Sequence, residues 1–219
     1  MTELDKAYEK AEMLMALDLP ISKVQLDNLW QLEEKNGKTH REDIRNYFYE
    51  KCFVHYSKRI MNIRQAKIRG EVIVAKPVLL LAIIKGIDSE VFVKNEFKLT
   101  EWLESKYVML MQMYMRNSQF DKPTDISNPY WHLQSDGFWY LQYSGETLGK
   151  GITPSKAWLK ENVDYAYFDE PLWIMLQNKV WRTKLRDYIV EHKLTDDSWF
   201  GKIAAEKGLG AIAALLLVA

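Results

Sequence analysis

Three stretches of the chain that lie on expected helices carry the spacing Glu-x-Lys, which is half of a common nuclease signature. Metal-dependent cleavage of a phosphodiester needs several carboxylates that converge on a divalent ion. None of the three stretches follows a strand that bears the partner aspartate, so we predict no catalytic residue and keep a cryptic metal-dependent nuclease as an alternative. The stretches are Glu33-Glu34-Lys35, Glu104-Ser105-Lys106 and Glu191-His192-Lys193.

The histidines and the single cysteine do not form a pattern that binds zinc. Zinc sites draw their ligands from closely spaced cysteine and histidine pairs, whereas the four histidines here are scattered. Cys52 stands three residues before His55 on an expected helix beside Phe53 and Val54, which favours a buried structural thiol over a nucleophile. No glycine-rich phosphate loop or dinucleotide fingerprint occurs. We therefore predict no metal and no cofactor. The histidines are His40, His55, His132 and His192.

Positive charge is concentrated between residues 51 and 70. The whole chain is balanced, with 30 Lys and Arg against 30 Asp and Glu, but this window contains no acidic residue. Charge attraction at moderate salt falls off over about 10 Å, so a local excess can hold phosphates on a neutral molecule. A solvated helix face is the alternative. We predict that Arg64, Lys67 and Arg69 contact DNA; the window also holds Lys51, Lys58 and Arg59.

The N-terminus and the longest apolar run both argue against export or membrane insertion. Residues 1–5 open acidic and lack the order of a signal peptide. The apolar run 78–84 is flanked by lysines and is shorter than the roughly 20 residues that span a bilayer. One cysteine permits no intrachain disulfide. These features predict a cytoplasmic protein without a membrane partner.

Hydrophobic spacing predicts a mostly helical chain. Ser22 is a plausible N-cap, Thr39 with Glu42 resembles a capping box, and Pro77 suits the first turn of a helix that is apolar nearly all round and therefore central to the core. The expected helices cover residues 3–17, 22–36, 39–63, 77–84, 99–115, 156–162, 172–176 and 180–192.

Two short strands are expected around Ser135-Asp136-Gly137, because Asp-Gly is a strong signal for a hairpin turn. The strands would be Trp131-His132-Leu133 and Phe138 to Leu141, and residues 92–97 form a further candidate strand. The fold class is therefore predicted as α+β, a predominantly helical single domain with a small antiparallel hairpin or sheet. We expect a helical N-terminal extension over 1–60, a recognition domain over 61–195 and an apolar tail over 196–219.

Four motifs in order resemble the DNA sulfur-binding domain family, whose members bind phosphorothioate-modified DNA in modification-dependent restriction endonucleases. The resemblance covers roughly residues 64–192, and its longest motif is fairly specific. The motifs are Ala75-Lys76-Pro77-Val78-Leu79-Leu80-Leu81, Pro129-Tyr130-Trp131-His132-Leu133-Gln134-Ser135-Asp136-Gly137-Phe138-Trp139, Thr153-Pro154-Ser155-Lys156 and Phe168-Asp169-Glu170-Pro171-Leu172-Trp173.

The resemblance implies a DNA-binding groove around these motifs. Lys76 would supply a basic contact before the apolar helix, Pro129 would help to form an apolar cup for the sulfur, and Lys156 would contact backbone or base. Asn128 stands where the family commonly has tyrosine, and His132 stands where a small residue lines the cup. A proline ring accepts a poorly hydrated sulfur cheaply but penalises an unbonded phosphate oxygen.

The sequence thus predicts a DNA-binding module that reads phosphorothioate-modified double-stranded DNA within a restriction or defence system. Family members usually precede a histidine-asparagine-histidine nuclease domain, and after His192 we expect too little chain for one. A nuclease subunit on another chain is the implied partner, and the chain itself is not expected to be an enzyme. A protein-interaction subunit of a defence locus remains an alternative, with the apolar tail as its surface.

Overall fold

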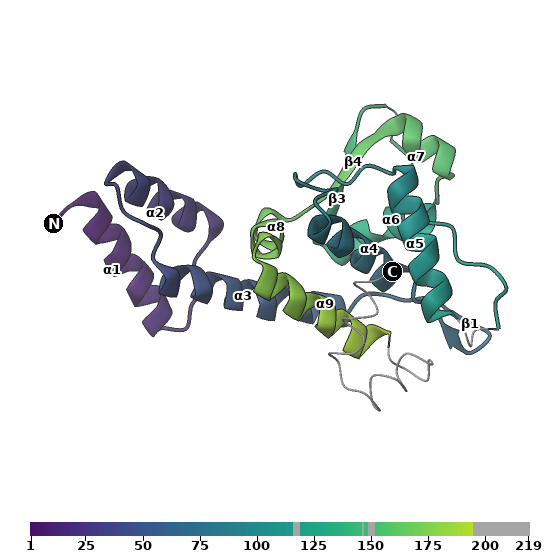
Figure 1. Ribbon diagram of the computed structural model, residues 1–219, viewed down its shortest axis with the longest axis horizontal. Helices are drawn as coiled ribbons and strands as arrows, with labels where there is room; N and C mark the ends of the chain where they lie inside the picture. Colours follow the sequence, from purple (N-terminus) through teal and green to yellow (C-terminus); the bar gives the residue numbers. More distant parts are fainter. Residues whose placement is uncertain (116–118, 146, 149–151, 195–219) are drawn as a thin grey trace.

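The computed structural model describes residues 1–115, 119–145, 147–148 and 152–194. A helical hairpin lies at one end of the molecule, and the long helix α3 connects it to the main body, where α9 runs beside α3 (Figure 1). The elements are α1 (Glu3–Ala16), α2 (Lys23–Lys35), α3 (Glu42–Met61), β1 (Lys67–Ile68), β2 (Glu71–Val72), α4 (Ala75–Asp88), α5 (Glu101–Tyr114), α6 (Ser127–His132), the 3-10 helix η1 (Leu133–Asp136), β3 (Trp139–Tyr143), α7 (Lys156–Asn162), β4 (Val163–Phe168), α8 (Glu170–Gln177) and α9 (Lys179–Lys193).

A buried carboxylate ties the N-terminal helices to the start of α3. Glu33 is fully buried and accepts hydrogen bonds from the Tyr8 hydroxyl at 2.9 Å and from the Arg41 backbone N–H at 3.1 Å. Its other oxygen lies 2.9 Å from His40 Nδ1. A buried carboxylate is tolerated when its oxygens are all bonded in this way. Glu33 is therefore a structural residue, although it lies in one of the Glu-x-Lys stretches.

The expected capping box at Thr39 is wrong. Arg41 is the N-cap residue of α3 and makes no side-chain cap bond. Its guanidinium instead pairs with Glu12 and Asp43, which fastens α1 to the first turn of α3. The predicted cap at Ser22 is confirmed, because its hydroxyl accepts a bond from the Gln25 N–H and Gln25 bonds back.

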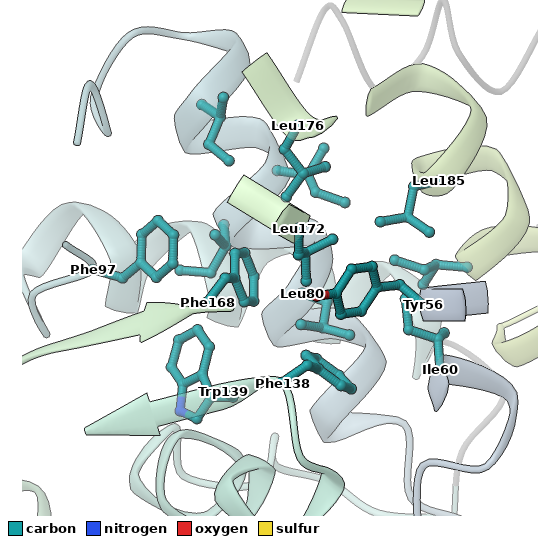
Figure 2. Close-up of a cluster of buried hydrophobic side chains, with 14 of the residues drawn as sticks. Tyr56, Ile60, Leu80, Phe97, Phe138, Trp139, Phe168, Leu172, Leu176 and Leu185 are labelled. Atoms are coloured by element: carbon teal, nitrogen blue, oxygen red, sulfur yellow. The ribbon is translucent and has the colours of Figure 1, made fainter. Parts of the chain in front are cut away.

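Helix α4 forms the centre of the core, as its apolar sequence predicts. All residues from Pro77 to Ile84 are buried, with Pro77 in the first turn, where a missing N–H costs nothing. Around it gather side chains from α3, the two longer strands, α8 and α9, including Tyr56, Phe97, Phe168 and Leu172 (Figure 2). No helix among the described residues is long and apolar enough to cross a membrane.

The predicted hairpin around Asp136-Gly137 is wrong. Trp131 and His132 belong to α6, Leu133 opens η1, and Gly137 adopts φ +76° as the left-handed residue that ends the helical segment. Strand β3 pairs instead with β4, antiparallel, with Trp139 opposite Phe168. The expected strand over 92–97 reduces to a single bridge between Phe97 and Ala166. Glycine with positive φ serves a helix end and a hairpin turn equally well, which explains the error.

The α+β class is confirmed, since helices dominate and the described strands form two small antiparallel sheets, β1 with β2 and β3 with β4. The helices expected over 156–162, 172–176 and 180–192 correspond to α7, α8 and α9. The last turns of α3 contribute Tyr56 and Ile60 to the main core (Figure 2). The predicted apolar tail, 196–219, lies outside the described residues.

Candidate nucleic-acid interface

The segment from Pro129 to Trp139 places the short helix α6 and the 3-10 helix η1 against strand β3. Asp125 accepts the Ser127 N–H at 2.9 Å and so opens α6, and Pro129 falls in the first turn. The Trp139 indole donates to the Tyr130 carbonyl at 2.8 Å, and the Tyr130 hydroxyl donates to the Phe97 carbonyl at 2.7 Å. These buried aromatic residues therefore fix α6 in place and leave its outer side for contacts.

Asp136, at the end of η1, binds both the side chain of Lys76 and the backbone of Arg64. The ammonium nitrogen of Lys76 lies 2.6 Å from Asp136 Oδ2, and the two side chains are only 11% and 5% exposed. The Arg64 N–H donates to the other carboxylate oxygen at 3.4 Å. One carboxylate thus joins the start of α4, the segment after α3 and the end of η1, which are far apart in sequence.

His132 lies beside this group. Its Nε2 is 2.8 Å from the Thr153 hydroxyl, which ties α6 to the segment before α7. Burial, and then the positive charge of Lys76, lower the pKa of His132 below its ordinary value, so its ring is neutral at pH 7. The structure therefore brings Lys76, His132 and the backbone of Arg64 together.

The two residues that flank the expected sulfur cup differ in exposure. Asn128 is exposed and stands one helical turn before His132, so both belong to the same side of α6. Pro129 is buried. Its part in an apolar cup stays a prediction, and it requires that covering side chains move aside to uncover the ring.

Lys156 lies at a separate place, where α7 meets the N-terminal half of α5. Its ammonium is 2.6 Å from Glu104 Oε2, and Lys160 is 2.6 Å from the other oxygen. Burial opposes ionisation of Glu104, but the hydrogen bonds from the two lysines outweigh it and lower the pKa of the carboxyl. Glu104, from a second Glu-x-Lys stretch, is thus held by lysines of α7.

Lys67 and Arg69 belong to the β1–β2 hairpin. Both are exposed, and Arg69 sits at the turn with φ +51°. The hairpin is fastened by Gln119, whose side chain donates to the Arg69 carbonyl at 3.1 Å. In Figure 1 the hairpin and α7 lie at opposite ends of α5, so these two cations and Lys156 are well separated.

A solvent-open hollow of about 370 Å³ is lined by Asp136 and by residues of the last turns of α3. Most of its basic residues were not predicted as site residues. Arg59 anchors it by donating to the carbonyl of Gly137 at 3.0 Å and, through Nε, to His55 Nε2 at 2.9 Å. The available signal was helical spacing within the basic run, since residues three and four apart share a helix face. We name this the α3 hollow; its lining is His55, Lys58, Arg59, Asn62, Arg64, Ser135 and Asp136.

The part of the chain that the structure describes offers neither a metal site nor a reactive cysteine. No group of three or more His, Cys, Asp or Glu side chains there could hold a metal ion. Cys52 is buried in α3, and burial raises the pKa of its thiol to about 12. A thiol with so high a pKa is a poor nucleophile at neutral pH.

The sequence matches no protein-family model and no curated protein. The structure is similar to a solved structure described as the sulfur binding domain of SprMcrA complexed with phosphorothioated DNA. The likeness covers 72% of this chain and 94% of that chain, with a TM-score of 0.51 and 14% sequence identity. At so low an identity the likeness shows the fold alone, which this chain shares with that domain.

Proposed function

We propose that this protein is a module that binds double-stranded DNA and reads phosphorothioate modification. The observation that carries the proposal is the Lys76–Asp136 pair, with the Arg64 backbone bonded to Asp136 and His132 near Lys76, on a fold similar to that of the SprMcrA domain. Phosphate contacts position a protein on a duplex, whereas a separate, chemically selective contact supplies specificity.

The selective contact in this proposal is made by the outer side of α6. Asn128 offers an exposed amide, and the neutral ring of His132 presents less charge to a phosphate than an imidazolium would. Sulfur is larger and less well hydrated than the oxygen that it replaces, so a largely apolar contact accepts it at small cost. Contact with the ring of Pro129 completes the pocket once the residues over it shift.

The cations have different parts in the proposal. Lys76 is nearest to the selective contact and is oriented by Asp136. Lys156 contributes from a separate place at the start of α7, and Lys67 and Arg69 contribute from the β1–β2 hairpin. We assign recognition to residues 61–195 and treat 1–60 as a helical extension.

The wider role that follows is recognition within a restriction or defence system, with cleavage performed by a nuclease domain or subunit elsewhere. Metal-dependent cleavage needs several carboxylates that converge on an ion, and no group among the described residues could hold one. No specific contact in the structure favours the protein-interaction alternative over DNA binding.

A shift assay at low salt tests the proposal. The protein is titrated into two duplexes of identical sequence, one of which carries a single phosphorothioate linkage, in the presence and absence of Mg²⁺. We expect a complex that favours the modified duplex and no cleavage of either. Absence of a complex with both duplexes at low salt would contradict DNA recognition, and Mg²⁺-dependent cleavage would assign a nuclease activity instead.

A further inference from the structure

The lysines that the family resemblance selects are already neutralised within the protein. Lys76 has the Asp136 carboxylate at 2.6 Å, and Lys156 has that of Glu104 at 2.6 Å. A phosphate that approaches either lysine meets a pair with little net charge. The sequence-independent attraction for DNA depends on cations that gain a phosphate partner and thereby release counterions from the duplex. These two lysines are therefore poor sources of that attraction.

The α3 hollow has the opposite character. The side chains of Lys58 and Arg64 are exposed, and neither forms an ion pair with a carboxylate in the described part of the chain. Asp136 is the acidic residue of the lining, but its two oxygens accept bonds from Lys76 and from the Arg64 N–H. The charge of Asp136 is therefore largely offset by that of Lys76, and Asp136 forms no ion pair with the side chain of Lys58 or Arg64.

Arg59 gives the hollow a fixed wall. Its guanidinium bonds to the Gly137 carbonyl and to His55 Nε2. Because arginine can only donate, His55 Nε2 must accept, which places the ring proton on Nδ1 and leaves the ring neutral. The pKa of His55 is correspondingly lowered, by burial first and then by the charges of Arg59 and Lys58. The hollow is thus a cationic site with preset geometry.

We propose that the α3 hollow binds an unmodified phosphate of the DNA backbone and is the principal electrostatic anchor of the interface. Lys58 and Arg64 supply the charge, and the amide of Asn62 lies exposed in the same lining as a neutral donor. Asp136 lines this site and also pairs with Lys76, so the hollow adjoins the place of the selective contact. The inference rests on the proposed function.

The test is the dependence of the dissociation constant on salt concentration. We measure binding of the wild type, Lys58→Ala, Arg64→Ala and the double variant to both duplexes over a series of salt concentrations. A lost phosphate contact lowers the slope of log K against log salt by about 0.9, so the double variant should lose about 0.9 and each single variant less, because Lys58 and Arg64 share one phosphate. The preference for the modified duplex should stay unchanged, since this site contacts an ordinary phosphate.

Lys38→Ala is the matched control, because Lys38 is an exposed lysine that follows the end of α2, and α2 lies in the helical hairpin at one end of the molecule (Figure 1). It should leave the slope unchanged. A wild type that binds while the double variant keeps the wild-type slope would overturn the inference and leave the proposed function standing. A wild type that binds neither duplex would overturn both. Lys58 and Arg64 are exposed, so their variants should fold, which thermal unfolding checks.

Discussion

Lys76 and Asp136 form a nearly buried ion pair, with 2.6 Å between Nζ and Oδ2, although 59 other residues separate them in the chain. The same carboxylate holds the Arg64 backbone. One interaction therefore positions the first turn of α4, the end of η1 and the segment after α3, which together make up the centre of the proposed DNA-binding surface.

Removal of Asp136 should be costly. Asp136→Ala leaves the ammonium of Lys76 poorly solvated and without its partner, and breaking such a pair costs about 3 kcal/mol in the free energy of unfolding. Urea denaturation measures this. Lys156→Met is the matched control, because Lys156 is 40% exposed and an exposed pair contributes less than about 1 kcal/mol. Equal losses in the two variants would contradict the structural role of Asp136.

Gly137 should resist substitution more strongly than Gly70. Both have positive φ, +76° and +87°, so alanine at either strains the backbone by about 1 kcal/mol. A Cβ at Gly137 would also collide with Nη1 of Arg59, whereas nothing lies within 4 Å at Gly70. Gly137→Ala should therefore lower the unfolding free energy further than Gly70→Ala, and Arg59→Ala should remove the steric part of that excess. Identical losses at the two glycines would contradict the close approach of Arg59.

Stability should fall on acidification partly because of His132. Its pKa in the folded protein is lowered by burial and by Lys76, whereas the unfolded chain takes up the proton near pH 6.5. As the pH drops from 6.5 through the folded pKa, the unfolded state binds more protons, and the folded state loses stability. His132→Gln should reduce this loss, measured as the difference in unfolding free energy between pH 7.5 and 5.5. An NMR titration of the ring that gives an ordinary pKa would contradict the prediction.

Cys52 should be protected from thiol reagents in the folded protein. It is buried, and burial raises its pKa to about 12, so both access and thiolate are lacking at pH 7. Labelling should be slow in native buffer and rapid in denaturant, as followed by mass spectrometry. Equally fast labelling under both conditions would show that this part of α3 opens readily.

How much the sequence could reveal depended on the range of the interactions. The core helix α4 was predictable because an unbroken apolar run next to Pro77 specifies a buried helix locally. The pairing of β3 with β4 was not predicted, since it joins Trp139 to Phe168 across the intervening helix α7. Val163–Phe168 does carry a strand signal in its valine and aromatic residues, but the Asp136-Gly137 pair indicates a local hairpin instead.

The candidate site shows the same division. The basic run after Lys51 and the motif at Pro129 could be read from sequence, but the state of each cation could not. Only the fold shows that Asp136 neutralises Lys76, that Glu104 neutralises Lys156, and that Lys58 stays exposed. Ion pairs between distant elements leave no local pattern in the sequence. Residue type alone therefore does not distinguish a lysine that is paired with a carboxylate from one that is not.

The most direct test of the central claim is the ratio of dissociation constants of the wild-type protein for two duplexes that differ in one sulfur atom. Both are measured by fluorescence anisotropy at the same salt concentration, because affinity for DNA has no meaning without it. We predict tighter binding to the phosphorothioate duplex by about tenfold or more, which corresponds to about 1.4 kcal/mol. Equal dissociation constants would contradict the reading of sulfur, even if both duplexes bind.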